Sequence, residues 1–178
     1  KLKSLRLGNN FLRGHSSRVY DLSQQILKNL VNLEELDLSS NFLQGLVPDK
    51  LFEMTNLKFL NLGNSGMEFG SRDVLSQVTF ELSSLKMLDL SNSLILGSIP
   101  SEIGLLTELT SIVLDSNDLT GTLPSEMGAL VKLKELNIRN NFLTGKIPTQ
   151  IGTFLTQLNS IVLDSNYLTG ELPSEMGA

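Results

Sequence analysis

The chain has 178 residues, a net charge of −5 and no cysteine, and 40% of its residues are hydrophobic. This length is enough for one domain with a real core, and the acidic balance argues against a nucleic-acid surface, which needs clustered Lys and Arg. Without cysteine the chain has no disulfide, thiolate metal site or cysteine nucleophile, and no apolar run approaches the roughly 18 residues of a membrane span. We expect no nucleic-acid partner and no membrane contact by this segment itself.

One stretch of the chain returns almost unchanged. Ser111–Ala129 reads SIVLDSNDLTGTLPSEMGA and recurs at Ser160–Ala178 with 17 of 19 positions identical. The unit is L-x-x-L-x-L-x-x-N-x-L-x-G-x-[ILV]-P, and its copies start near Leu2, Leu33, Leu57, Leu85, Leu109, Leu133 and Leu158. All five prolines hold its sixteenth position: Pro48, Pro100, Pro124, Pro148 and Pro173. A repeat of this length predicts a solenoid.

Each copy should open with a short strand. In Ser111–Asp115 the apolar Ile112 and Leu114 alternate with outward Ser111, Val113 and Asp115, which is the period of a strand. Because the strands recur in one direction, we expect a parallel sheet with one face open to solvent.

A recurrent asparagine follows each strand in most copies. Its carboxamide both donates and accepts, so it can satisfy backbone groups where the chain turns. The predicted asparagine ladder is Asn10, Asn41, Asn117, Asn141 and Asn166. Ser65 and Ser93 replace it in the third and fourth copies. A hydroxyl reaches less far, so the weakest joints of the stack are predicted there.

After the turn, a second extended segment contains Gly and Pro, and a short helical turn should follow it, with Ser101, Ser125 or Ser174 as its cap. Two copies are longer and predict true helices, because apolar residues recur there at helical spacing. These residues are Val19, Leu22, Ile26 and Leu30 in the first copy, and Val74, Leu75, Val78 and Leu82 in the third.

The segment L-T-G-x-[IL]-P-x-x-[IM]-G resembles plant-type leucine-rich repeat proteins, with similar repeats in plants and diatom-type algae. The resemblance covers essentially residues 1–178 and implies a single domain. The implied fold is an α/β solenoid, a right-handed superhelix with a parallel inner sheet, short convex helices and proline-bearing second strands. Because the chain begins with Lys1 and ends partway through a repeat, we expect a fragment of a longer protein.

The resemblance also implies a function: recognition of a protein or peptide ligand through the concave face of a receptor-like protein. The parent protein would lie on the extracellular face of the plasma membrane or be secreted. One alternative is a cytoplasmic scaffold or regulatory protein, which the absence of cysteines and Asn-x-Ser/Thr sequons favours. Another is a secreted inhibitor of a cell-wall-degrading enzyme.

Outward strand positions are the candidate ligand-binding residues. Phe59 and Met87 should be neighbours, with Val113 one strand beyond, and an exposed apolar patch of this kind often marks an interaction site. Asp115, Arg139 and Asp164 should lie side by side, either as a site for a cation or basic peptide or, as we favour, as a self-neutralising row of charges. The other candidates on this face are Asp89, Asn61, Asn137 and Val162.

Catalysis, metals and cofactors find no support in the sequence. His15 is the only histidine, and we expect a solvated loop residue there, with a pH switch as the alternative. Serines and carboxylates recur by repeat and do not converge as nucleophile and base, so any kinase or other activity would lie outside this fragment. The ends lack polar capping repeats and expose core-type side chains, which predicts end-to-end self-association. These side chains are Leu163, Leu168, Leu172 and Met176.

Overall fold

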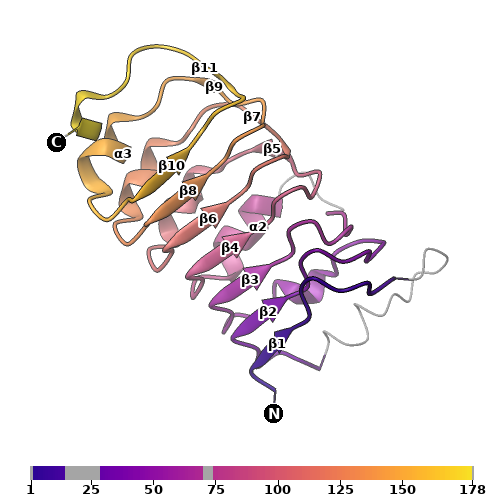
Figure 1. The fold of residues 1–178 in the computed structure, drawn as a ribbon. Coiled ribbons are helices and arrows are strands. Elements are labelled where there is room, and N and C mark those ends of the chain that lie inside the picture. The colour runs from indigo at the N-terminus through magenta and orange to yellow at the C-terminus, as the bar shows by residue number, and fades with distance from the viewer. Residues whose placement is uncertain (1, 15–28, 70–73, 178) are drawn as a thin grey trace.

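The structure is a computed structural model that describes residues 2–14, 29–69 and 74–177. The chain winds into a curved stack, and each repeat adds one strand to a single parallel sheet (Figure 1). The sheet order is β1-β2-β3-β4-β6-β8-β10. The bounds are β1 Ser4–Arg6, β2 Glu35–Asp37, β3 Phe59–Asn61, β4 Met87–Asp89, β6 Ser111–Val113, β8 Glu135–Asn137 and β10 Ser160–Val162. The predicted strands and parallel sheet are confirmed.

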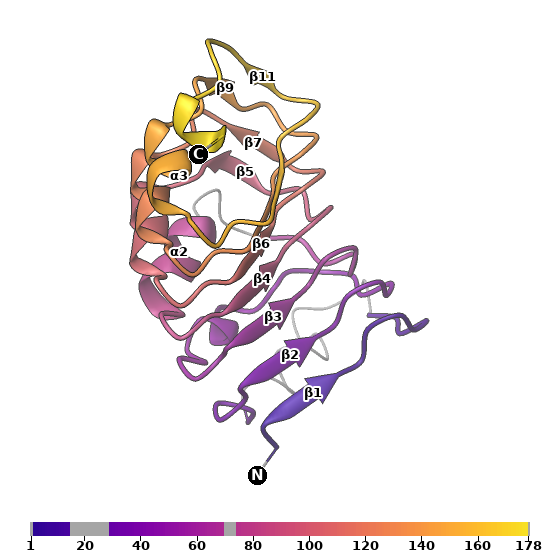
Figure 2. The same ribbon diagram turned by 60° about the vertical axis from the view of Figure 1, so that its left-hand side comes forward.

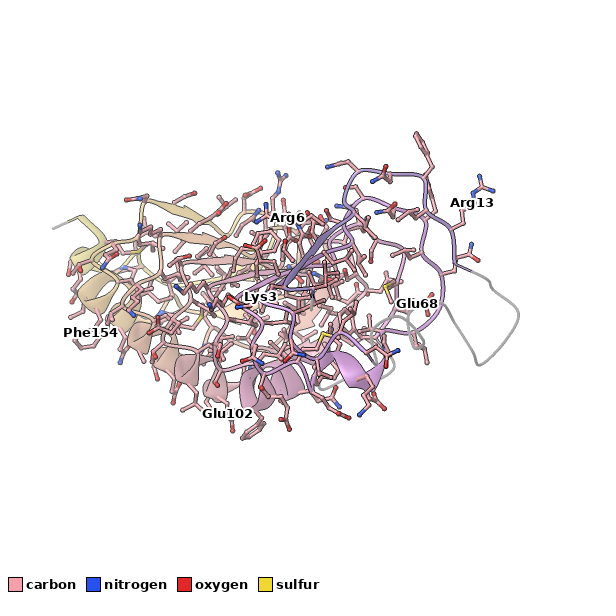
Figure 3. All side chains as sticks on the ribbon, turned by 90° about the horizontal axis from the view of Figure 1, so that it is seen from below. Lys3, Arg6, Arg13, Glu68, Glu102 and Phe154 are labelled. Atoms are coloured by element: carbon pink, nitrogen blue, oxygen red, sulfur yellow. The ribbon has the colours of Figure 1, made fainter. Side chains whose placement is uncertain are left out.

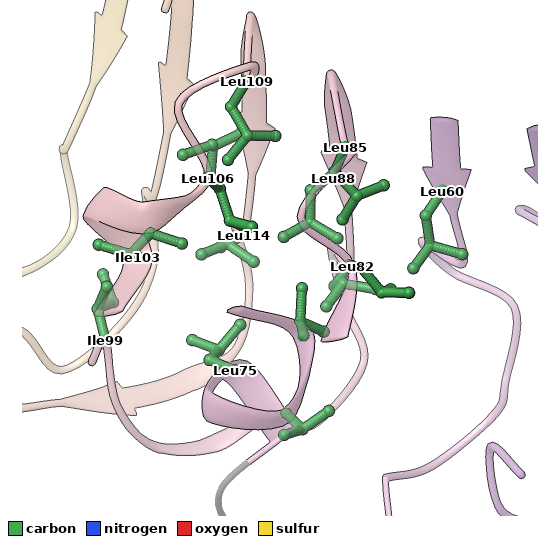
Figure 4. Packing of buried hydrophobic residues seen from close by; sticks show 14 of the residues in the cluster. Leu60, Leu75, Leu82, Leu85, Leu88, Ile99, Ile103, Leu106, Leu109 and Leu114 are labelled. Atoms are coloured by element: carbon green, nitrogen blue, oxygen red, sulfur yellow. The ribbon is translucent and has the colours of Figure 1, made fainter. Parts of the chain in front are cut away.

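The middle residue of each strand points into the core. Strands pair in register through this position, so Leu36, Leu60 and Leu88 lie side by side and are fully buried. Figure 4 shows how Leu88 and Leu114 from the strand side pack near Leu75 from the opposite side. Each buried leucine stabilises the fold by about 1.5–3 kcal/mol relative to an exposed one. The core is therefore a continuous row of aliphatic layers.

Short second strands run along another side of the stack. They form two parallel pairs: β5 Leu96–Ser98 with β7 Asp118–Thr120, and β9 Thr144–Gly145 with β11 Tyr167–Leu168. The glycine after β7, Gly121, has φ of +79°, a conformation that other residues rarely adopt. The prolines follow these strands in extended conformation, as at Pro100 with φ −73° and ψ 152°. The second extended segment therefore leads directly into the convex side.

Short helices cover the side opposite the sheet (Figure 2). The 3₁₀ helices are η1 Asp49–Leu51, η2 Ser101–Leu105, η3 Ser125–Ala129 and η4 Ser174–Gly177, and the α-helices are α2 Val74–Glu81 and α3 Thr149–Phe154. The helix predicted in the third copy is confirmed by α2, whose Val74, Leu75 and Val78 are buried. The first copy's predicted helix, with Val19, Leu22 and Ile26, lies outside the described residues. Leu30 packs against the core.

The predicted serine caps are wrong. Pro100 precedes η2 without a side-chain cap, and its carbonyl accepts a hydrogen bond from the Ile103 N–H at 3.1 Å. Because the proline ring fixes φ near the helical value, the first turn closes without a serine oxygen. The serines lie inside the helices, and each hydroxyl donates to the next glutamate: Ser101 to Glu102, Ser125 to Glu126 and Ser174 to Glu175.

Four asparagines of the ladder bond to the preceding repeat, whereas Asn10 donates to the Leu7 and Gly8 carbonyls of its own repeat. Asn117 donates from Nδ2 to the carbonyls of Leu90, in the preceding repeat, and Leu114, in its own, at 2.9 and 3.0 Å. Its Oδ1 accepts the N–H groups of Ser93 and Ile95 at 3.1 and 3.0 Å. With a further bond from Nδ2 to the Asp115 carbonyl at 3.3 Å, one carboxamide satisfies two donors and three acceptors at this turn. Asn41, Asn141 and Asn166 make the same kind of bridge.

The serine copies turn differently. The Ser93 hydroxyl donates to Ser91 O within its own repeat at 3.1 Å, and the Ser65 hydroxyl accepts only the nearby Met67 N–H at 3.3 Å among the bonds in the described ranges. The residue that follows each serine has a left-handed backbone, with φ of +77° at Gly66 and +54° at Leu94. That these joints are the weakest remains a prediction.

Apolar side chains are also exposed at both ends of the stack. Leu172 is 77% exposed and Leu2 is 49% exposed, whereas Leu163 and Leu168 are partly buried. End-to-end self-association through these side chains remains a prediction. Among residues 2–14, 29–69 and 74–177, no helix combines the length and the apolar character that crossing a bilayer requires.

Candidate recognition surface

The outward side chains of the sheet lie in straight rows because all seven strands share one register. One row is Ser4, Glu35, Phe59, Met87, Ser111, Glu135 and Ser160. The next is Arg6, Asp37, Asn61, Asp89, Val113, Asn137 and Val162. Arg6 lies on the opposite side of the molecule from Glu102 and Phe154 of the convex helices (Figure 3). We call the surface formed by these two rows, together with Asp115, Arg139 and Asp164 two residues after Val113, Asn137 and Val162, the concave face.

Phe59 and Met87 are direct partners on β3 and β4, as the repeat predicts. Val113 pairs with Asp89 in the next row, so it lies diagonally from Met87. All three apolar side chains are half-buried. The Arg6 guanidinium lies 5.0 Å from the centre of the Phe59 ring, a cation–π distance. The apolar area open to a ligand is therefore smaller than three fully exposed side chains would offer. The Arg6 guanidinium covers one edge of this area.

Carboxylates occupy the centre of the concave face. Burial raises the pKa of the Asp89 carboxyl, the neighbouring Asp115 and Asp37 charges add to the rise, and bonds from Ser91 oppose it. The Ser91 N–H and hydroxyl donate to Asp89 Oδ1 at 3.0 and 2.7 Å. In the preceding repeat a Cβ on Gly63 would lie 2.7 Å from this oxygen, so the glycine makes room for it. This part of the face therefore presents carboxylate oxygens, which are hydrogen-bond acceptors, in a partly buried position.

The predicted charge row is only partly self-neutralised. Arg139 Nε lies 3.5 Å from Asp164 Oδ2 in an exposed ion pair. Asp115 instead accepts a hydrogen bond from the Asn137 amide at 3.4 Å. An exposed ion pair of this kind contributes about 0–1 kcal/mol. Val162 and Asn61 lie on the same face, at its C-terminal edge and beside Asp89.

In the part of the chain that the structure describes, no residues are candidates for binding a metal ion or for a pH switch. His15 lies outside the described residues. Within the described ranges, no group of three or more His, Cys, Asp or Glu side chains is placed to hold a metal ion. The Glu34 carboxyl binds Lys3 and Lys58 on both sides, at 2.5 and 2.6 Å. These bonds lower its pKa to about 2 and tie the first three repeats together at the surface.

A second surface was missed by the sequence reasoning. Aromatic rings lie at the tenth position of four repeats and stack in pairs on the edge of the solenoid, next to the asparagine ladder. Phe11 and Phe42 have ring centres 6.2 Å apart, and Phe142 and Tyr167 have centres 6.1 Å apart. All four are exposed. The sequence signal for this surface is the recurrence of an aromatic residue directly after the ladder asparagine, in Phe11, Phe42, Phe142 and Tyr167.

The chain is similar in sequence to a known protein family. A family model described as Leucine Rich Repeat matches residues 32–54, 84–106, 108–130 and 132–154, together more than half of the chain. Receptor-like protein 39 of Arabidopsis thaliana is 35% identical over 119 residues, which are 66% of this chain and 12% of that protein. The chain thus spans a small part of the curated relatives it matches.

Solved structures agree in shape. The plant peptide hormone receptor RGFR1, in complex with RGF2, has a TM-score of 0.81 and 32% identity over 99% of this chain and 26% of that one. The ectodomain of the Arabidopsis receptor kinase HAESA, with a peptide hormone ligand, has a TM-score of 0.72 and 30% identity over 99% of this chain and 32% of that one. The fold is thus similar to plant receptor ectodomains that bind peptide ligands. The chain belongs to the leucine-rich repeat family.

Proposed function

We propose that this segment recognises a peptide or protein ligand on its concave face, as part of the extracellular region of a plant-type receptor-like protein. The observation that carries the proposal is the shared register, which sets Phe59 opposite Met87 in the middle of an open sheet face. Seven strands about 4.8 Å apart span roughly 30 Å. That length accommodates about nine residues of extended peptide.

The chemistry of the face defines the ligand further. Apolar side chains at Phe59, Met87 and Val113 offer a desolvated contact for one apolar side chain of the ligand. Asp89 pairs with Val113, Asp37 pairs with Asn61 in the same row, and an ionised carboxylate offers only hydrogen-bond acceptors. A peptide that pairs an apolar residue with a Lys or Arg would therefore satisfy both groups. The net charge of −5 favours association with such a ligand.

The test is a binding screen of a secreted peptide and protein panel against the 178-residue chain. The variant Phe59→Asp/Met87→Asp should weaken binding by about a hundredfold or more, because it places charges at the centre of the contact. The matched control is Phe80→Asp/Leu105→Asp, which changes side chains 64% and 61% exposed on the convex side. Circular dichroism and a urea midpoint would establish that both variants are folded.

The outcomes separate the proposals. Loss of binding in the concave variant alone supports recognition on this face. Equal binding by wild type and the concave variant would move the site to the convex side or the edge. A panel of extracellular ligands with no binder would favour the cytoplasmic scaffold instead, in which case a panel of intracellular proteins becomes the next measurement.

A further inference from the structure

The edge of the last four repeats carries a groove that the concave face does not use. We propose that this groove binds a neutral oligosaccharide chain. The proposal is independent of the peptide site, because the groove is lined in part by the ladder residues Asn117, Asn141 and Asn166 and shares no residue with the two concave rows. We call it the edge groove, and its volume is about 450 Å³.

One wall of the edge groove is apolar and aromatic except at Asp118. It consists of the residues after the ladder position in repeats four to seven: Leu94, Asp118, Phe142 and Tyr167. Leu94 and Tyr167 are 63% and 62% exposed, and Phe142 is 46% exposed. The two rings are nearly parallel, at 17°. A pyranose has a face made of C–H groups, which packs on an aromatic surface of this kind through apolar and dispersion contact.

The other wall is a row of small polar side chains. It consists of the eighth residues of the same repeats: Asn92, Ser116, Asn140 and Ser165. These residues share a left-handed backbone, with φ between +48° and +57°, so the row repeats with the stack. The Asn140 amide donates to the Ser116 hydroxyl at 3.3 Å, and the Asn92 amide donates to Asn64 Oδ1 at 2.7 Å. An amide has two donors and an acceptor oxygen, so most of its capacity is left for a ligand.

Spacing and charge select the ligand class. Neighbouring repeats lie about 4.8 Å apart, close to the advance of a glycan chain per pyranose unit. Sugar hydroxyls both donate and accept, which matches amides and hydroxyls that do the same. Of the described residues that line the edge groove, Asp118 alone carries a charge. Its two oxygens can accept from two neighbouring sugar hydroxyls, whereas an acidic uronate would be repelled. These properties favour a neutral glycan over a nucleic acid or a charged peptide.

The test titrates the 178-residue chain with cellohexaose, xylohexaose and mannohexaose in calorimetry, and with polygalacturonate as the charged probe. At least one neutral hexamer should bind. Binding should change the NMR chemical shifts of the Asn140 amide and the Tyr167 ring. Phe142→Ser/Tyr167→Ser should weaken that binding at least about tenfold, because stacking is lost. Asp118→Asn, which keeps the shape of the wall, should weaken it about threefold to tenfold.

The control is Phe80→Ser, since this ring is 64% exposed on α2 and should leave glycan binding unchanged. Phe59→Asp/Met87→Asp should also leave it unchanged, which separates this proposal from the peptide site. The proposal is overturned if none of the neutral hexamers binds at millimolar concentration. It is also overturned if polygalacturonate binds more tightly than the neutral hexamers, or if folded ring variants keep full affinity.

Discussion

The joints between repeats four to seven differ from the two joints on either side of repeat three. In the former, Asn117, Asn141 and Asn166 each reach into the preceding repeat with the amide group and accept its backbone N–H with the oxygen. In the latter, the hydroxyls of Ser65 and Ser93 bond only within their own repeat, among the described residues. The sheet register is the same in both regions. Pairing of the strands and hydrogen bonding of the backbone at the turns therefore hold neighbouring repeats together independently of each other.

The turn backbone compensates for the missing amide. In the serine joints a second left-handed residue follows the serine, and the Leu43 N–H bonds to the Ser65 carbonyl at 2.8 Å instead of to a side chain. Gly66 adopts this backbone freely, whereas Leu94 pays the steric cost of a Cβ, about 1–2 kcal/mol. A main-chain carbonyl thus replaces the side chain at the Ser65 joint, whereas the Ser93 joint carries backbone strain at Leu94.

The largest expected effect breaks a ladder joint. Asn117→Ala removes a carboxamide that bonds to Ser93 N, Ile95 N and Leu90 O in a buried turn. Unsatisfied buried groups are costly, so we expect a loss of about 3 kcal/mol in the free energy of unfolding, measured by urea denaturation. Ser93→Ala is the comparison and should cost about 1 kcal/mol, because it removes one bond. Equal losses would show that the two joints are not different.

A smaller effect should improve the serine joint. Leu94 is 63% exposed, so Leu94→Gly gives up little packing and relieves the left-handed strain. We expect a gain of about 0.5–1 kcal/mol in unfolding free energy, the strain relief being partly offset by glycine's entropy in the unfolded chain. Leu46→Gly is the matched control, since Leu46 is 55% exposed and is not among the residues with positive φ. It should lose about as much, and a gain there would refute the strain argument.

The smallest effect concerns the carboxylates of the concave face. Because the pKa of Asp89 is raised above 3.8, the folded state holds this proton more tightly than the unfolded chain. Wild type should therefore lose stability relative to Asp89→Asn as pH rises from 3.8 through the folded pKa, and the difference should then stay constant up to pH 7. We expect less than about 1 kcal/mol, since solvent screens a half-buried group. Urea midpoints between pH 3 and pH 7 measure it, and a difference independent of pH would contradict the assignment.

Much of the fold follows from the repeat itself. A fixed period places the strands, the buried leucines and the asparagines, because each copy solves the same packing problem as its neighbours. The helix α2 was predictable for the same reason, since Val74, Leu75 and Val78 fall on one face. The candidate residues of the concave face lie in the predicted rows. Whether they bind a ligand remains a proposal.

Other features depend on geometry that a pattern does not carry. The serine caps failed because the residue before each helix, such as Pro124, already supplies the turn through its backbone. The left-handed Leu94 could not be predicted, since nothing about leucine favours that conformation. The extent to which Arg6 covers Phe59 depends on side-chain reach across two strands.

The stacking of repeats has a mechanical consequence. The seven strands of the main sheet pair in chain order, so each repeat is bonded only to the repeats before and after it in this sheet. A force applied to the two ends would release single repeats in steps. Each released 24-residue copy would add roughly 80 Å of extended chain. The joints at Ser65 and Ser93, which we predict to be the weakest, would open at the lowest force. The asparagine joints of the later repeats would open at higher force.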